Sequence, residues 1–262
     1  MNLLLPLCPP RYPCVMEPDE LGVPCGIEYE PFLRATGGAK GTNFAFMSEK
    51  TGRPIQCLSM GERAVAMLLE VDPWVRDYRE QYVRASDELL AAIAENPSEP
   101  VLRNKVFTLD VVATYQTRHQ MDREYETFSV KETRAEALKK ANQRRFAREQ
   151  EDAKSRGWAW RGIVKEEMNV PAVLAAARLI RWGGAFSYRD RQEVAMSLAE
   201  LVTSMNTGQP LDELLEAIGR KLDISVVDDA YQFFSMAVCF GFLAVDLTKG
   251  LGTRMPVHLR GL

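Results

Sequence analysis

Apolar residues at helical spacing mark a helix near residue 60. Ser59 is a favoured N-cap residue, and Glu62 follows three positions later, at the spacing of a capping box. An apolar run over 65–69 then supplies one face of the helix. The pair Asp72-Pro73 ends the pattern, because the residue before a proline disfavours the helical backbone. We therefore expect a helix from Ser59 to about Asp72.

The next segments have the pattern of strands. Residues 75–84 alternate between polar and apolar side chains, and 105–116 and 125–133 are rich in β-branched and aromatic residues. A polar turn joins the last two segments, so we expect them to pair antiparallel. A short helix is expected between the first two strands, over 86–95, where Asn96-Pro97 ends it.

A long basic segment follows the strands. Residues 134–156 predict one helix, and 156–168 predict a further strand with Trp158, Trp160 and Ile163 as core anchors. Strands and helices in this order indicate an α/β fold, in which a mixed sheet is flanked by helices.

The sequence changes character near residue 169. Pro171 suits the first turn of a helix, and further helices are expected at about 187–205, 211–222 and 227–241. Two short runs around Lys249-Gly250 then resemble a β-hairpin. Helices followed by a hairpin have the order of a winged-helix-like domain.

These patterns divide the chain into three regions. Residues 1–50 are rich in Pro and Gly and predict an irregular arm. Residues 51–168 form the α/β domain, and 169–262 form a C-terminal helical, winged-helix-like domain. The last helix is apolar and carries no basic reading face, so we expect this domain to bind protein at least as much as DNA.

Charge is distributed unevenly along the chain. The 262 residues carry a formal net charge of −3, so a DNA-binding surface would have to be local. Residues 131–165 hold eleven Lys and Arg against five acids, a net charge of +6. Such a run is usually a solvated helix face, but this one follows a candidate catalytic lysine. We expect contacts with DNA phosphates at Lys139, Lys140, Arg144 and Arg145.

The location of the protein is expected to be cytoplasmic. Neither a signal peptide nor a membrane-spanning segment is predicted. Five cysteines without a Cys-x-x-Cys pair indicate reduced thiols rather than a disulfide scaffold or a zinc cage. A metal site that includes Cys8, Cys14 and Cys25 is the alternative.

Two acids and one lysine form a candidate catalytic group. Glu62 lies on the expected helix, Asp110 in one strand and Lys131 in the next. Phosphodiester hydrolysis uses divalent cations, which offset charge on the phosphate and lower the pKa of the attacking water. Mg²⁺ prefers hard oxygen ligands, usually one or two carboxylates with waters and phosphate. Glu62 and Asp110 could supply those oxygens, and Lys131 could orient the water.

Structural roles remain open for the same residues. Glu62 could be only the capping partner of its helix. Asp110 lies in an apolar strand, where a carboxylate without a partner is costly. A buried salt bridge to Lys131 would supply that partner.

The segments around these residues share the order and spacing of one nuclease family. Residues 58–84 contain a Glu-bearing helix followed by a Val-x-x-Tyr-Arg-Glu-Gln strand, 107–112 read FTLDVV, and 128–132 read FSVKE. A basic helix and GWAWRGIVKEEM (157–168) follow. The chain therefore resembles TnsA, the endonuclease subunit of heteromeric bacterial transposases, in the PD-(D/E)xK nuclease superfamily. The resemblance covers roughly residues 51–168.

The resemblance implies a restriction-endonuclease-like core that cuts DNA with Mg²⁺, two ions in all, with Mn²⁺ able to substitute. Glu62, Asp110 and the Val130 carbonyl would be metal ligands, and Lys131 would lie near the attacking water. Ser129 stands where the family has Gln. Serine is too short to reach a metal directly, so we expect it to act through a water.

Two other acids, Glu126 and Glu132, could compensate for the short Ser129 side chain. By strand alternation, however, both point away from the face that carries Lys131. The replacement of Gln by Ser129 is therefore expected to affect the affinity of the site for metal.

The implied activity is a nick in the 5′ strands at transposon ends, in double-stranded DNA. A TnsB-like DDE transposase and a TnsC-like AAA+ ATPase would be the partners. Two alternatives remain open. One is another PD-(D/E)xK nuclease, of the restriction or junction-resolving type, and the other is a catalytically impaired assembly subunit that binds DNA or protein.

Overall fold

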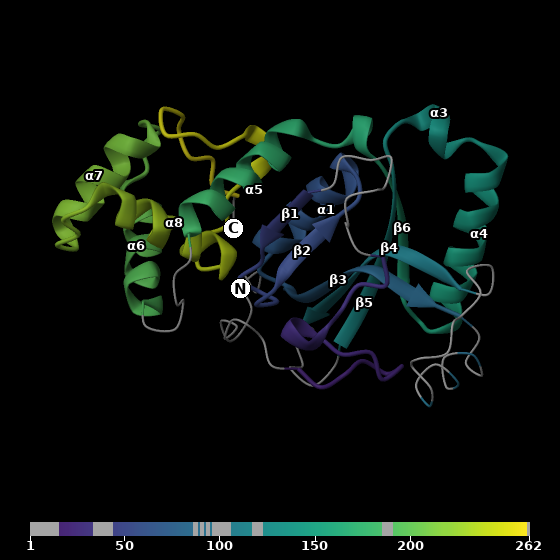
Figure 1. Cartoon of the computed structure of the whole chain (residues 1–262). Coiled ribbons are helices and arrows are strands. Elements are labelled where there is room, and N and C mark those ends of the chain that lie inside the picture. Colours follow the sequence, from purple (N-terminus) through teal and green to yellow (C-terminus); the bar gives the residue numbers. More distant parts are fainter. Residues whose placement is uncertain are drawn as a thin grey trace.

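A sheet lies at one end of the molecule and a group of helices at the other (Figure 1). The computed structural model describes most of the chain. The described residues are 16–33, 44–85, 89, 92, 95, 106–116, 123–184 and 191–260. The expected helix over 86–95 and the turn after residue 116 lie largely outside them, although positions 89, 92 and 95 are helical.

The sheet has four strands in the order β3-β4-β5-β6. β3 pairs with β4 and β4 with β5 antiparallel, whereas β5 and β6 are parallel. The expected mixed α/β sheet with flanking helices is thereby confirmed. The bounds are Val75–Arg84 for β3, Phe107–Gln116 for β4, Arg123–Lys131 for β5 and Ala159–Val164 for β6.

A two-stranded antiparallel ribbon precedes the sheet, with β1 at Phe44–Met47 and β2 at Pro54–Cys57. β1 lies inside the region expected to be irregular, and the ribbon spans the boundary drawn at residue 50. Each strand has only four residues, and the surrounding Gly and Pro obscure the alternation in the sequence.

The described part of the N-terminal arm docks on β3. It contains a 3-10 helix, η1 (Gly26–Glu28). Asp19 forms an ion pair with Arg79, with 2.5 Å between Oδ2 and the guanidinium, and accepts a hydrogen bond from the Tyr82 hydroxyl at 2.7 Å. Because Asp19 and Arg79 are both buried, this pair fixes the arm to the core.

Helix α1 (Met60–Val71) follows the ribbon with the expected ends. The Ser59 hydroxyl accepts the Glu62 N–H, and Asp72 is the C-cap. The Glu62 carboxylate accepts the backbone N–H of Leu58 at 2.8 Å, one residue before the position that a capping box uses.

The prediction of a single basic helix over 134–156 is wrong, because the segment forms two helices. They are α3 (Arg134–Ala137) and α4 (Lys140–Ser155). Lys139 has ψ 134, an extended value that interrupts the helix. Side-chain amides close the end of α3: Asn142 donates to the Glu136 carbonyl at 2.8 Å, and Gln143 donates to the Ala137 carbonyl at 2.7 Å.

All three residues expected to anchor the strand after α4 contact the core, but to different extents. Trp158 is buried, whereas Trp160 and Ile163 are only partly buried. A 3-10 helix, η3 (Lys165–Glu167), then leads to the C-terminal helices. β6 is an edge strand of the sheet, which leaves its outward side chains less covered.

Four helices form the C-terminal group in the described part of the chain. Asn169 caps the first of them, and Pro171 lies in its first turn, as expected. The first part of the helix expected over 187–205 lies outside the described residues. The helices are α5 (Val170–Gly183), α6 (Gln192–Met205), α7 (Leu211–Lys221) and α8 (Val227–Cys239).

The hairpin expected near Lys249-Gly250 is reduced to a single bridge. Val245 pairs antiparallel with Leu259, and the Asp246 N–H donates to the His258 carbonyl at 2.7 Å. Between them the described chain turns through a 3-10 helix, η5 (Leu247–Lys249), instead of continuing as strands. The Asp246 carboxylate accepts the Thr248 N–H and starts this turn.

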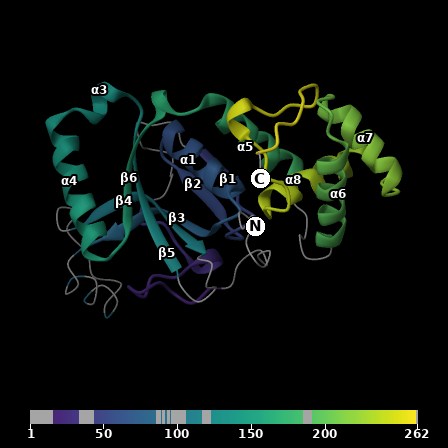
Figure 2. The ribbon, with the colours of Figure 1, turned by 180° about the vertical axis from the view of Figure 1, so that it is seen from behind.

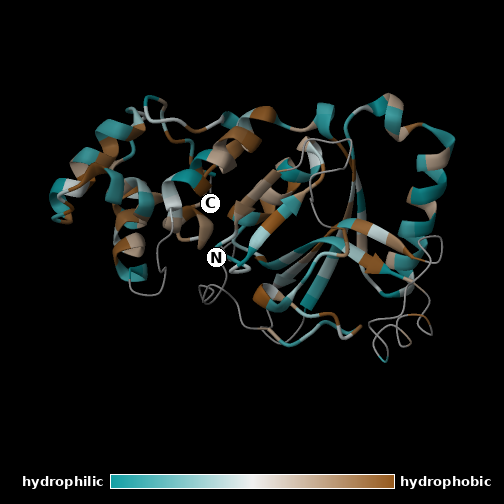
Figure 3. Ribbon diagram, in the orientation of Figure 1, coloured by the Kyte–Doolittle hydropathy of each residue, from teal (hydrophilic) through white to brown (hydrophobic). Residues whose placement is uncertain are grey.

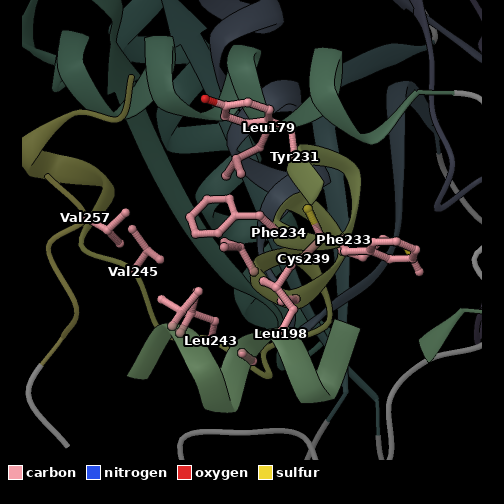
Figure 4. Packing of buried hydrophobic residues seen from close by; sticks show 14 of the residues in the cluster. Leu179, Leu198, Tyr231, Phe233, Phe234, Cys239, Leu243, Val245 and Val257 are labelled. Carbon is pink, nitrogen blue, oxygen red and sulfur yellow. The ribbon is translucent and has the colours of Figure 1, made fainter. Parts of the chain in front are cut away.

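One apolar cluster joins both parts of the molecule. It contains Met67 and Val71 of α1 together with buried residues of α5 to α8. Figure 4 shows its centre, where Phe234 lies between Leu179 and Leu198. The cluster therefore crosses the boundary that sequence analysis placed at residue 168.

The hydropathy of the residues differs between elements. Figure 3 shows hydrophilic residues along most of α4 and hydrophobic stretches on the central strands and on α5.

Within the described part of the chain, no helix combines the length and apolarity that crossing a membrane requires. Cys25, Cys57 and Cys239 are free and buried, while Cys8 and Cys14 lie outside the described residues.

Candidate active site

Asp110 lies where β4 and β5 separate. The β4–β5 pairing runs from Gln116↔Arg123 to Val111↔Phe128 and does not include Asp110. The Asp110 carboxylate accepts a hydrogen bond from the Val130 N–H at 2.7 Å. The carboxylate thus takes the place of a β4 backbone carbonyl as the acceptor for this N–H. Asp110 is only 5% exposed, so its carboxylate is held in place by the strand that carries Lys131.

Lys131 faces the same point. Its ammonium nitrogen is 4.0 Å from Asp110 Oδ2 and donates to the Val130 carbonyl at 2.8 Å. It also lies 5.5 Å from the centre of the Phe146 ring. The distance between the Lys131 nitrogen and the Asp110 carboxylate is at the outer limit of an ion pair. Lys131 is therefore not the main partner of Asp110.

Glu62 reaches the site from α1. Its carboxylate accepts hydrogen bonds from the Leu58 N–H at 2.8 Å and from the Gln81 amide at 3.3 Å. Burial and, to a smaller extent, the charge on Asp110 raise the pKa of Glu62 to about 7, against the lowering effect of Leu58, Gln81 and Lys131. The structure therefore brings Glu62, Asp110 and Lys131 together from three elements.

Gln81 completes the β3 side of the site, and sequence analysis gave it no role. It has φ 49, a left-handed backbone that is rare for a residue other than glycine. Its neighbours Glu80 and Tyr82 pair with Val111 and Leu109, so Gln81 lies opposite Asp110. Strained backbone of this kind concentrates at functional sites, and here it accompanies an amide bonded to Glu62. The only sequence signal was its place in the Arg-Glu-Gln motif.

Ser129 contacts a carboxylate that sequence analysis missed. The Ser129 hydroxyl donates to Glu149 of α4, and both residues are fully buried. Trp160 Nε1 donates to the same Glu149 oxygen at 3.4 Å. Ser129 was expected to act through a water, and in the structure its hydroxyl is engaged by the Glu149 carboxylate. No pattern along the basic helix distinguishes Glu149 from its solvated neighbours.

Arg145 is also part of this site, although it was expected at a DNA surface. Its guanidinium lies 2.6 Å from Asp110 Oδ1 and 2.6 Å from Glu149 Oε1. It also donates to the Thr108 carbonyl at 3.1 Å. Arg145 is thus the close ion-pair partner of Asp110. The other three expected DNA contacts, Lys139, Lys140 and Arg144, are exposed.

Glu126 and Glu132 make contacts away from Lys131. Glu126 pairs with Arg161 at 2.8 Å. Glu132 accepts the Gly61 N–H at 2.8 Å, at the N-terminus of α1 where an anion is favoured. Neither carboxylate lies beside Lys131, as strand alternation predicted.

The donor set is compatible with a hard divalent cation. Two buried carboxylates, Glu62 and Asp110, are close enough for the charge on Asp110 to raise the pKa of Glu62, and Asp110 also accepts the Val130 N–H. In the described parts of the chain, no three His, Cys, Asp or Glu side chains form a closed metal site. Mg²⁺ commonly binds one or two carboxylates and takes its other ligands from water and phosphate.

Comparison with known proteins adds no family. No protein-family model matches the sequence, and no curated protein matches it significantly.

Proposed function

We propose that this protein is a metal-dependent DNA endonuclease. The observation that carries the proposal is the convergence of Glu62, Asp110 and Lys131 at one buried point, although they come from α1, β4 and β5. An ammonium 4.0 Å from one carboxylate, and a second carboxylate whose pKa is raised to about 7, form an arrangement suited to phosphate chemistry.

Each residue has a defined role in this proposal. Glu62, Asp110 and the Val130 carbonyl would hold Mg²⁺, which offsets charge on the phosphate and lowers the pKa of the attacking water. Lys131 would orient that water and stabilise the negative charge that develops on the phosphate. Gln81 would keep Glu62 turned toward Asp110, because its amide donates to the Glu62 carboxylate.

The DNA path would run beside α4. Lys139, Lys140 and Arg144 are exposed near the start of this helix, on the element that also delivers Arg145 to Asp110. Figure 2 shows α4 at the outer edge of the sheet, where a duplex can approach. Contacts of this type give affinity that falls with salt and does not depend on sequence.

The biological setting we propose is transposition. The resemblance of residues 58–84, 107–112 and 128–132 to TnsA supports nicking of the 5′ strands at transposon ends. A TnsB-like DDE transposase and a TnsC-like AAA+ ATPase would act with the protein. Co-purification with these two partners would separate this setting from that of a restriction or junction-resolving nuclease.

A nicking assay tests the activity. Purified protein, alone and with its proposed partners, is incubated with supercoiled DNA and with Mg²⁺ or Mn²⁺. We expect Asp110→Asn and Lys131→Met to reduce nicking by at least about 100-fold, because each removes a group that acts on the reacting phosphate. Asp110→Asn keeps an oxygen acceptor for the Val130 N–H, so the strand geometry should survive.

Glu126→Gln is the matched control, since Glu126 lies on β5, the strand of Lys131, but pairs with Arg161. It should retain nicking. Undiminished nicking by either active-site variant would remove that residue from the mechanism. DNA binding without nicking by the wild-type protein, in the presence of both metals and both partners, would favour the impaired assembly subunit.

A further inference from the structure

Arg145 holds the carboxylate that a metal ion would need. One terminal nitrogen of its guanidinium donates to Asp110 Oδ1 at 2.6 Å and to the Thr108 carbonyl at 3.1 Å. Its Nε donates to Glu149 Oε1 at 2.6 Å. The other oxygen of Asp110 accepts the Val130 N–H. Both oxygens of Asp110 are therefore already engaged within the protein.

A guanidinium at this position opposes the binding of a divalent cation to the same carboxylate. A metal on Asp110 would lie close to a fixed positive charge, and like charges repel strongly in a partly buried site. Asp110 is 5% exposed, so water screens this repulsion poorly. Metal binding is therefore favoured only if Arg145 releases Asp110 or if a further negative charge enters.

The attachment of Arg145 allows such a release. Glu149 is fully buried and is held by the Ser129 hydroxyl and the Trp160 indole. It is also one helical turn from Arg145. The guanidinium can therefore stay bonded to Glu149 while its terminal nitrogens leave Asp110. The Arg145 side chain is 37% exposed, so those nitrogens can reach an incoming ligand.

A DNA phosphate is the ligand whose chemistry matches these features. Guanidinium groups bind phosphate oxygens through paired hydrogen bonds, and Arg144 and Lys140 are exposed on the same helix. We propose that Arg145 is a resident counter-cation that occupies Asp110 until a DNA phosphate draws it away. Metal and DNA then bind cooperatively, and the site stays weakly loaded without DNA. This inference rests on the proposed nuclease function and adds its regulation.

Mn²⁺ binding, measured by electron paramagnetic resonance without any cleavage, tests the inference. In the wild-type protein, a short duplex DNA should raise the Mn²⁺ affinity by at least about tenfold. In Arg145→Gln without DNA, the Mn²⁺ affinity should already be raised by about tenfold, and DNA should add little more. Arg148→Gln removes a positive charge one turn away, from a side chain that stacks on Phe107, and should change the Mn²⁺ affinity less than twofold.

Three results overturn the inference. The first is that duplex DNA leaves the Mn²⁺ affinity of the wild-type protein unchanged. This measurement uses the wild-type protein alone and so does not depend on the folding of a variant. The second is an unchanged or weaker Mn²⁺ affinity in a folded Arg145→Gln protein. The third is equal tightening in Arg148→Gln, which would indicate a general effect of charge.

Asp110→Asn separates this inference from the proposed function. If Asp110→Asn leaves Mn²⁺ binding intact, the metal is not in this site, and both proposals fail. If Asp110→Asn abolishes Mn²⁺ binding but Arg145→Gln has no effect, only the role of Arg145 fails.

Discussion

Three carboxylates and two cations meet where β4 and β5 separate. Asp110 and Glu149 each have the Arg145 guanidinium at 2.6 Å, and Lys131 lies 4.0 Å from Asp110. Among the described residues, the hydrogen bonds to the Glu62 carboxylate come from neutral donors, a backbone N–H and an amide. Burial of Glu62, and to a smaller extent the charge on Asp110, raises its pKa to about 7, and these neutral donors offset only part of that effect.

The raised pKa makes the stability of the metal-free protein depend on pH. An unfolded Glu has a pKa of 4.5, against about 7 in the fold, so between these values the folded state binds more protons than the unfolded state. Stability from this group is complete below about pH 4.5 and is lost as the pH rises through 7. The loss is on the order of 3 kcal/mol.

Glu62→Gln tests this dependence. Because the variant cannot ionise, its free energy of unfolding should exceed that of the wild type at pH 8 by more than at pH 5, in denaturant titrations without metal. Adding Mg²⁺ at pH 8 should stabilise the wild type and not the variant. The same difference between the two proteins at both pH values would show that Glu62 does not titrate in this window.

At the scale of elements, the site depends on how closely α1 approaches β5. A methyl group on Gly61 would lie 2.6 Å from a Val130 methyl group and 3.3 Å from Lys165 Cβ. The helix can approach this closely only because residue 61 has no side chain. Glu62, the next residue, is thereby carried to Asp110.

Gly61→Ala should therefore lower stability and activity together. We expect a loss of about 1 to 3 kcal/mol in the free energy of unfolding and at least a tenfold loss of nicking, since α1 must move away from β5. Gly219→Ala in α7 is the matched control, because its new methyl group would meet atoms only at 3.4 Å and beyond. That control should be neutral or slightly stabilising. Equal nicking by Gly61→Ala and wild type would contradict the role given to this contact.

Local patterns explain which parts of the site could be predicted from the sequence. Glu62 belongs to a capping pattern, Asp110 interrupts an apolar strand, and Lys131 alternates along the next strand. Glu149 and Arg145 could not be predicted in the same way, because their roles depend on how α4 packs beside β6. Along the chain, both look like members of a charged, solvated helix face.

The same limit applies to the fold. The strands of the sheet and most helix ends could be predicted from side-chain periodicity, caps and prolines. The break between α3 and α4 could not, since it is stabilised by the side-chain amides of Asn142 and Gln143 on the last carbonyls of α3. The antiparallel contact of Val245 with Leu259 replaced a full hairpin because η5 turns the chain directly after Asp246.

At the scale of the whole molecule, one apolar cluster joins α1, the helix that carries Glu62, to the C-terminal helices. Met67 and Val71 of α1 pack in the same cluster as Leu179, Leu198 and Phe234. The helix that positions Glu62 is therefore supported from the C-terminal side, and the C-terminal helices are part of the framework of the site.

Phe234→Ala tests this coupling. Phe234 is fully buried, so truncation should cost about 3 to 5 kcal/mol. Because the cluster is shared, thermal unfolding followed by far-ultraviolet circular dichroism should remain a single transition at a lower temperature. Two separate transitions, of which only one shifts, would show that the C-terminal helices unfold independently of α1.

The position of a bound divalent cation tests the central claim most directly. A crystal structure of the protein soaked with Mn²⁺, together with a short duplex DNA, would locate the ion by its anomalous scattering. We predict an anomalous peak between the carboxylates of Glu62 and Asp110, beside the Val130 carbonyl. A saturated crystal with no peak there, or with Mn²⁺ bound only elsewhere, would contradict the nuclease site.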